Sequence, residues 1–227
     1  MRTVHVDWGV VGARVLAARC DVVVVCDVLS FSTAVSVATA RDVTVWPFAW
    51  RDEAAGAFAL EVGAVLAGGR DDAVSLSPAS LAALAPGSRV VLPSPNGAGC
   101  CLAAAAAGVP VVAGCLRNAP AVATWLHGRD GDVGLVAAGE RWPDGSLRPA
   151  YEDWVGAGSI AALLSGLALT AEAEAAALAA SARRPLGEVA SGVELIERGF
   201  AGDVEMAEDY GADDIVPLLV DGRFGSG

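Results

Sequence analysis

The hydrophobic positions of this chain form short runs, rich in Val, that alternate with segments rich in Ala. Several runs, such as 22–28, are continuously apolar at their centre instead of alternating between polar and apolar residues. Continuous β-branched runs are typical of strands that are covered on both faces of a sheet. A further strand is expected at 215–224, with a bend or hairpin at Asp221-Gly222. The other predicted strands are 3–7, 22–28, 43–48, 64–67, 89–93, 109–113 and 132–138.

The segments between these runs predict helices, and residues 170–210 are expected to be mostly helical. Ser77, Asn118 and Thr170 each stand where a side chain can cap the first turn of a helix. The alternation of strands and helices predicts an α/β fold, a three-layer α/β/α sandwich with a mainly parallel central sheet. We expect one domain over residues 1–227. The predicted helices before residue 170 are 32–40, 51–62, 78–85, 97–107, 119–127 and 152–165.

The net charge of the chain argues against some classes of binding partner. The formal net charge is −12, and all 15 cationic side chains are Arg, with no Lys. An acidic surface repels phosphate backbones, so we expect no nucleic-acid partner. The missing Lys excludes Schiff-base chemistry and a P-loop lysine.

The five cysteines and two histidines argue against a zinc site, because no C-x-x-C pair or His cluster is present. Reduced, buried thiols in a cytoplasmic protein are the expectation. The N-terminus has no signal-peptide pattern, and the apolar run around Asp27 is too short to span a bilayer. We therefore expect a soluble protein without a membrane partner.

Polar residues follow five of the predicted strands. In open α/β sheets, sites form at the carboxyl ends of the strands, so these residues are candidates for one shared site. Gly, Asn and Ser are also ordinary turn residues, and this alternative stays open for each of them. The residues after these strand ends include Asp27, Ser30, Arg70, Asn96, Gly97, Arg117, Asn118 and Glu140.

Asp27 follows "VVVVC" and precedes "VL", so its side chain is expected to be buried. A buried carboxylate needs a cation, a set of donors or a proton. A structural helix cap through Asp27 or Ser30 is the alternative.

Glu140, Glu152 and Asp153 could join Asp27 around a divalent ion. Oxygen ligands without His or Cys suit Mg²⁺, which takes one or two carboxylates directly. Two alternatives need no metal. Glu152 and Asp153 could be first-turn helix acids, and residues 141–149 could be a plain surface loop with a turn at Pro143-Asp144-Gly145.

Arginines lie beside the same strand ends, including Arg70, Arg117 and Arg148. Guanidinium groups match phosphate or sulfonate oxygens, and the Asn96-Gly97 turn opens a helix whose free N–H groups also favour an anion. Carboxylates for a metal, together with donors for an oxyanion, suit phosphoryl transfer.

Seven motifs in order resemble the 2-phosphosulfolactate phosphatase family, and they cover about residues 20–224. The resemblance implies an α/β/α fold and a Mg²⁺-dependent release of phosphate from 2-phospho-3-sulfolactate, on the route to coenzyme M. It places Asp27, Asn96, Gly97, Asn118, Glu152 and Asp153 on family motif positions. The motifs are "DVLSFSTA" (27–34), "AGGR" (67–70), "LSP" (76–78), "PSPNGAG" (93–99), "AGCLRNA" (113–119), "AAGE" (137–140) and "EDWVGAG" (152–158).

The chain departs from the family pattern at three positions. Ser30 stands where the first motif of the family usually has Arg. Leu76 replaces the Asn of the family's Asn-Ser-Pro motif, and Ala137 replaces the Cys of its Cys-Ala-Gly motif. These departures motivate the alternative of a non-catalytic protein that binds an anion or metabolite with the same fold.

The leading hypothesis is a Mg²⁺-dependent phosphatase that acts on a small, acidic phosphomonoester. We expect Asp27, with Glu152 or Asp153, to hold the metal, and the remaining acids, including Glu140, to transfer protons. An aspartyl-phosphate route is disfavoured, since "DVLSF" lacks a second Asp two residues on. Assembly into a homodimer is an alternative that the sequence leaves open. The expected substrate-binding residues are Ser30, Arg70, Asn96, Gly97, Arg117, Asn118 and Arg148.

Overall fold

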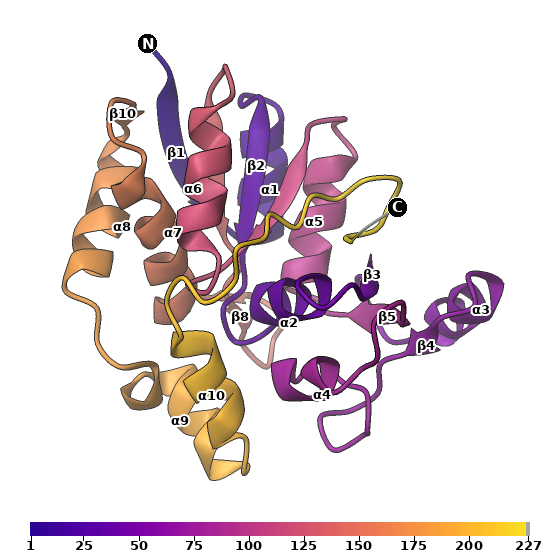
Figure 1. Cartoon of the computed structure of the whole chain (residues 1–227). Coiled ribbons are helices and arrows are strands. Elements are labelled where there is room, and N and C mark those ends of the chain that lie inside the picture. Colours follow the sequence, from indigo (N-terminus) through magenta and orange to yellow (C-terminus); the bar gives the residue numbers. More distant parts are fainter. Residues whose placement is uncertain (226–227) are drawn as a thin grey trace.

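Two parallel sheets form the centre of the computed structural model, which describes residues 1–225 (Figure 1). The larger sheet has the strand order β10-β1-β7-β2-β6, and the smaller has the order β3-β5-β4. All neighbouring strands within each of these sheets are parallel, which confirms the predicted topology. The strands are β1 (Thr3–Trp8), β2 (Val22–Cys26), β3 (Thr44–Phe48), β4 (Val65–Leu66), β5 (Arg89–Pro93), β6 (Val111–Gly114), β7 (Val133–Ala137) and β10 (Ala168–Leu169).

The C-terminal segment joins the two sheets. Leu218 forms an antiparallel bridge with Val112 of β6, and Phe224 forms one with Val45 of β3. The turn at Asp221-Gly222 is confirmed, but the prediction of a regular strand over 215–224 is wrong. The segment crosses two edge strands instead of running along one, so it forms only isolated bridges.

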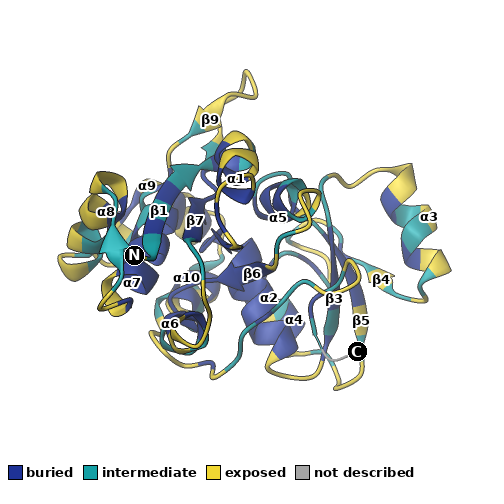
Figure 2. Ribbon diagram, turned by 90° about the horizontal axis from the view of Figure 1, so that it is seen from above, coloured by how far each residue is buried: buried dark blue, intermediate teal, exposed yellow. Residues whose placement is uncertain are grey.

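Helices cover both faces of the larger sheet, and the side chains of β2 pack against helices on each face. Val23 and Val25 pack in one core cluster with α1 (Gly9–Ala17), α2 (Phe31–Thr39) and α5 (Gly97–Ala105). Val22 and Val24 pack in another with α6 (Ala119–His127), α7 (Tyr151–Leu163) and α8 (Ala171–Ser181). Because side chains alternate across a strand, both faces of β2 are buried. Its neighbours β6 and β7 are also buried along their length and are drawn in dark blue in Figure 2. The three-layer sandwich is therefore confirmed.

Helix α1 was not expected from the sequence. It begins at Gly9, which has a positive φ of 63°, and it has neither a capping side chain nor an acid in its first turn. Without these start signals, its run of Val residues does not indicate a helix.

Two of the three predicted caps are confirmed. The Ser77 hydroxyl accepts from the Ser80 N–H at the start of α4 (Pro78–Ala82), and Thr170 accepts from the Ala173 N–H. Asn118 is not a helix cap: its Oδ1 accepts from the Cys115 N–H, and its amide donates to the Ala113 carbonyl. The remaining helices are α3 (Glu53–Glu61), η1 (Leu186–Glu188), α9 (Ala190–Glu197) and α10 (Ala201–Glu208).

The small residues of "VGAG" pack α7 against α8. A Cβ at Gly158 would overlap the carbonyl oxygen of Ala176, so only glycine allows this approach of the two helices. The same helix starts with Glu152 and Asp153, and this packing fixes their position relative to the sheet.

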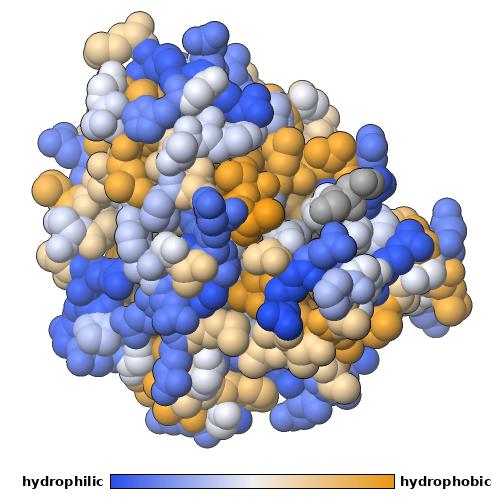
Figure 3. All heavy atoms as spheres, viewed as in Figure 1, coloured by the Kyte–Doolittle hydropathy of each residue, from blue (hydrophilic) through white to orange (hydrophobic). Residues whose placement is uncertain are grey.

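The surface carries intermingled hydrophilic and hydrophobic residues over the face drawn in Figure 3. Within residues 1–225, no helix is both long enough and apolar enough to cross a membrane. All five cysteines are buried and free of disulfides, as expected.

Candidate active site

The carboxyl ends of β2 and β7 bring the first two acids together. Cys26 at the end of β2 pairs with Ala137 of β7, so Asp27 and the segment leading to Glu140 leave the sheet at the same edge. Glu140 begins a short hairpin formed by β8 (Glu140–Arg141) and β9 (Leu147–Arg148). The segment 141–149 keeps the expected exposed turn at Pro143-Asp144-Gly145, but this turn joins two short strands instead of lying in a plain loop.

Asp27 lies between the amino ends of two helices. Its Oδ1 accepts from the Phe31 N–H of α2 at 3.0 Å, and its Oδ2 accepts from the Gly97 N–H of α5 at 2.8 Å. The Ser94 hydroxyl lies 3.4 Å from the same Oδ2. Burial raises the pKa of Asp27, whereas the two N–H donors oppose that rise. Asp27 is thus both a cap and a wall of the cleft described below.

Gly97 is required by this arrangement. A Cβ at this position would lie 2.6 Å from Asp27 Oδ2 and 2.5 Å from Cδ1 of Phe31. The carboxylate of Asp27 thus accepts from the Gly97 N–H at the amino end of this helix, where a substrate anion was expected.

Asp153 holds the two strand ends in place. Its Oδ1 accepts from the Val28 N–H at 2.7 Å, and its Oδ2 accepts from the Gly139 N–H at 2.8 Å. Val28 follows Asp27 and Gly139 precedes Glu140, so one carboxylate fixes the backbone beside both acids. Burial and the charges of Asp27 and Glu152 raise the pKa of Asp153 well above its usual value.

Glu140 faces the cleft with a shifted pKa. Its Oε2 accepts from the Asn96 amide at 2.9 Å. Burial, with the charges of Asp27 and Glu152, raises the pKa of Glu140 to about 7, against the opposing effects of Arg148 and Asn96. A group with this pKa can donate or accept a proton near neutral pH.

Glu152 is 2% exposed and does not line the cleft. Burial raises its pKa, and a hydrogen bond with Ser191 opposes the rise. Glu152 therefore acts on the site through its charge, which raises the pKa of Glu140.

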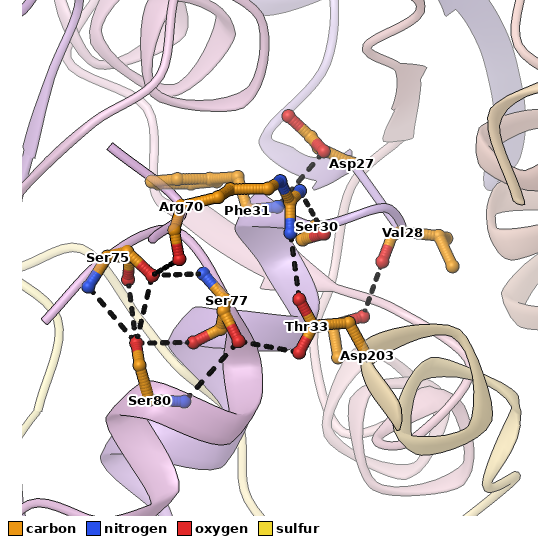
Figure 4. Close-up of polar contacts among 10 residues, drawn as sticks. All are labelled: Asp27, Val28, Ser30, Phe31, Thr33, Arg70, Ser75, Ser77, Ser80 and Asp203. Atoms are coloured by element: carbon orange, nitrogen blue, oxygen red, sulfur yellow. Dashed lines mark hydrogen bonds and ion pairs between the residues drawn. The ribbon is translucent and has the colours of Figure 1, made fainter. Parts of the chain in front are cut away.

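The cleft between these acids and α9 has a volume of about 380 Å³. Arg70 lies at one end, where it donates to Ser30 at 2.8 Å and pairs with Asp203 at 2.8 Å (Figure 4). Ser77 donates to the other oxygen of Asp203 at 2.6 Å. Ser30, at the position of the missing family Arg, is thus an acceptor for another arginine.

Two other arginines reach the cleft from the hairpin. Arg148 pairs with Glu194 of α9 at 2.8 Å, and Arg141 donates to Asn96 Oδ1 at 3.1 Å. Arg148 and Asn96 both line the cleft, and their expected role in substrate binding stays a prediction.

Arg117 and Asn118 do not belong to the cleft. Arg117 donates to both oxygens of Asp213 at 2.8 and 2.9 Å and pairs with Asp209, so it anchors the C-terminal segment. The Asn118 side chain is fully buried and bonds only to backbone groups. Their expected role in substrate binding is wrong, because both side chains are used by the fold.

The contribution of α9 was not expected from the sequence: Ser191 and Glu194 of this helix, and Arg198 directly after it, line the cleft. No recognised motif covers this helix, and its cleft residues follow no strand. Ser94, by contrast, lies directly after β5, so its position at a strand end was a usable signal.

The donor set fits a magnesium ion with few protein ligands. Within residues 1–225, no three His, Cys, Asp or Glu side chains form a ready-made metal site. The expected set of Asp27, Glu152 and Asp153 is not assembled, because Asp153 faces two backbone N–H groups. Asp27 lines the cleft, and its Oδ1, which accepts only from the Phe31 N–H among the described residues, keeps a second lone pair. Neighbouring acids also raise the pKa of Glu140, which marks an excess of negative charge that a cation would relieve.

The raised pKa of Glu140 predicts that stability depends on pH. Between its ordinary value of 4.5 and about 7, Glu140 is protonated in the folded chain but ionised in the unfolded chain. The folded state then binds more protons, so the free energy of unfolding rises as pH falls from 8 to 5.5. Thermal melting in EDTA should show this rise, and Glu140→Gln should reduce it. Exposed Glu205 provides the control: Glu205→Gln should keep the rise, and an unchanged slope in Glu140→Gln would refute the assignment.

Comparison with known proteins identifies a family for this chain. A protein-family model described as 2-phosphosulpholactate phosphatase matches residues 14–222 of the 227. No curated protein matches the chain.

Proposed function

The chain belongs to the 2-phosphosulpholactate phosphatase family, and we propose that it uses Mg²⁺ to hydrolyse 2-phosphosulfolactate or a related small, acidic phosphomonoester. The observation that carries this proposal is a single cleft in which Asp27 and Glu140 face Arg70, Arg141 and Arg148. Carboxylates for a hard cation and guanidinium groups for an oxyanion are the donors that phosphoryl transfer requires.

The arginines of the cleft bind and orient the phosphate. Each is held by a partner, such as Asp203 for Arg70 and Glu194 for Arg148, so little side-chain freedom remains to be lost when substrate binds. Three guanidinium groups also stabilise the negative charge that is spread over the phosphoryl oxygens in the transition state.

Asp27 would hold Mg²⁺ together with oxygens of the substrate, because magnesium in such sites takes few protein carboxylates. When bound, the ion polarises the phosphoryl group and neutralises part of its charge. The N–H groups of Phe31 and Gly97 fix the carboxylate of Asp27 in one orientation for this task.

Glu140 is the residue that transfers a proton. A water molecule attacks the phosphorus atom and forms the new P–O bond. Glu140 in its protonated form donates to the oxygen of the leaving alcohol as the old P–O bond breaks, and it regains a proton from the attacking water. Its pKa of about 7 keeps both forms populated near neutral pH. The Asn96 amide, at 2.9 Å, orients the carboxyl group.

A phosphate-release assay over a panel of small phosphomonoesters, including 2-phosphosulfolactate, tests the proposal. We expect release that requires Mg²⁺, stops with EDTA and returns when Mg²⁺ is added in excess. The highest kcat/KM should belong to esters with a second acidic group. Full activity in EDTA would contradict the metal requirement, and no release from any ester would contradict the assignment of the substrate class.

A further inference from the structure

Arg198 is the cleft arginine without a fixed partner. Arg70 is paired with Asp203, Arg148 with Glu194, and Arg141 with Asn96 and nearby carbonyl oxygens. Arg198 lines the same cleft, yet it makes no ion pair and donates no side-chain hydrogen bond within residues 1–225. Its guanidinium is thus available for a ligand.

The place of Arg198 puts its charge next to that of Arg70. Its guanidinium carbon lies 5.7 Å from the centre of the Phe200 ring, and that of Arg70 lies 5.5 Å from the same ring. Burial lowers the pKa of Arg70, and the nearby charge of Arg198 lowers it further. Two guanidinium groups therefore share one end of the cleft.

Asp203, the acid beside Arg70, already has hydrogen-bond partners for both of its oxygens. Both oxygens of Asp203 accept hydrogen bonds, one from Arg70 and one from Ser77 (Figure 4). Glu194 is the other acid beside Arg198, and it is already paired with Arg148. Both acids near Arg198 therefore hold another arginine, and Arg198 has no ion-pair partner among the described residues.

We propose that Arg198 binds a second anionic group of the substrate, beside the phosphate held by Arg70, Arg141 and Arg148, and thereby determines specificity for phosphomonoesters that carry a carboxylate or sulfonate. This inference rests on the proposed phosphatase function. Guanidinium groups match the oxygens of both anions. All N–H donors of the Arg198 side chain are free within the described residues, whereas each of the other three arginines already donates to a partner. The phosphate then lies towards Asp27 and Glu140.

Binding of two phosphonates tests the proposal without any catalytic step. Phosphonoacetate carries a phosphonate and a carboxylate, whereas methylphosphonate carries the phosphonate alone, and a phosphatase cleaves neither C–P bond. In the presence of Mg²⁺, titration calorimetry should show about tenfold to a hundredfold tighter binding of phosphonoacetate. Arg198→Ala should bring the ratio of the two dissociation constants close to one, and Arg198→Lys should keep part of it.

Arg183 offers a matched control. It also stacks over an aromatic ring, that of Tyr210 at 5.5 Å, but it lines a different cavity. Arg183→Ala should therefore keep the wild-type ratio, and the melting temperature of each variant checks its folding.

The outcomes separate the two proposals. An unchanged ratio in Arg198→Ala, or equal binding of the two phosphonates to the wild type, would overturn the role of Arg198 and leave the phosphatase assignment intact. If neither phosphonate binds, the cleft is not the phosphate site and both proposals fail.

Discussion

Asp27→Asn should lower phosphate release on the order of a thousandfold, because it removes the carboxylate that would hold the cation and keeps the shape of the side chain. Asp27 lines the cleft while its two oxygens accept from Phe31 and Gly97. In the variant, one of these N–H groups must face the NH₂ of the new amide. We therefore also expect a loss of about 1–3 kcal/mol in the free energy of unfolding.

Steady-state kinetics and thermal melting of the same preparations measure both effects. Asp130 is exposed and makes no side-chain hydrogen bond within the part of the chain that the structure describes, so Asp130→Asn is the matched control and should behave like the wild type. Wild-type activity in a folded Asp27→Asn protein would exclude Asp27 from the reaction. A folded variant that loses activity but binds phosphonoacetate would place the defect in the chemical step.

Asp153→Ala should cause the largest loss of stability among these variants. The substitution leaves the buried N–H groups of Val28 and Gly139 without acceptors, at about 1–3 kcal/mol each. Removal of one negative charge from a crowded group of acids offsets part of this cost. We expect a net loss of about 2–4 kcal/mol, which corresponds to a fall in melting temperature of about 4–16 °C for a chain of this size.

The activity of Asp153→Ala should fall as well, since both strand ends that carry the reacting acids lose their shared anchor. Asp153→Asn keeps one acceptor and should lie between the wild type and Asp153→Ala in melting temperature. If instead Asp153 were a metal ligand, both variants would melt like the wild type in EDTA and would lose only the stabilisation by Mg²⁺.

The sheet and most helices could be predicted because their signals are local. Runs such as "VVVVC" before Asp27 indicate strands buried on both faces, and hydroxyls such as that of Ser77 mark helix starts. Helix α1 could not be predicted, since its start at Gly9 has no such signal. The bridges of the C-terminal segment depend on which edge strands the fold leaves open, and that is not a local property.

Part of the site followed from position along the chain. Asp27, Asn96 and Glu140 were expected together because the carboxyl ends of parallel strands share one edge, and all three line the cleft. The same rule gave Arg117 a wrong role. It also follows a strand of that sheet, but Asp209 and Asp213, almost a hundred residues later, take its donors.

By itself, the sequence determined the layers of the fold, the parallel pairing of the strands and the sheet edge where acids and arginines gather. It could do so because hydrophobic periodicity and strand ends depend on residues that are neighbours in the sequence. Only the tertiary structure decided which side chains stay free for a ligand. Asp153 accepts hydrogen bonds from two backbone N–H groups, and Arg70 and Arg148 are paired with acids. Arg198, at the end of α9, lines the cleft without an ion-pair partner among the described residues. A hydrogen bond depends on distance in space, and residues as far apart as Val28 and Asp153 meet only when the chain is folded.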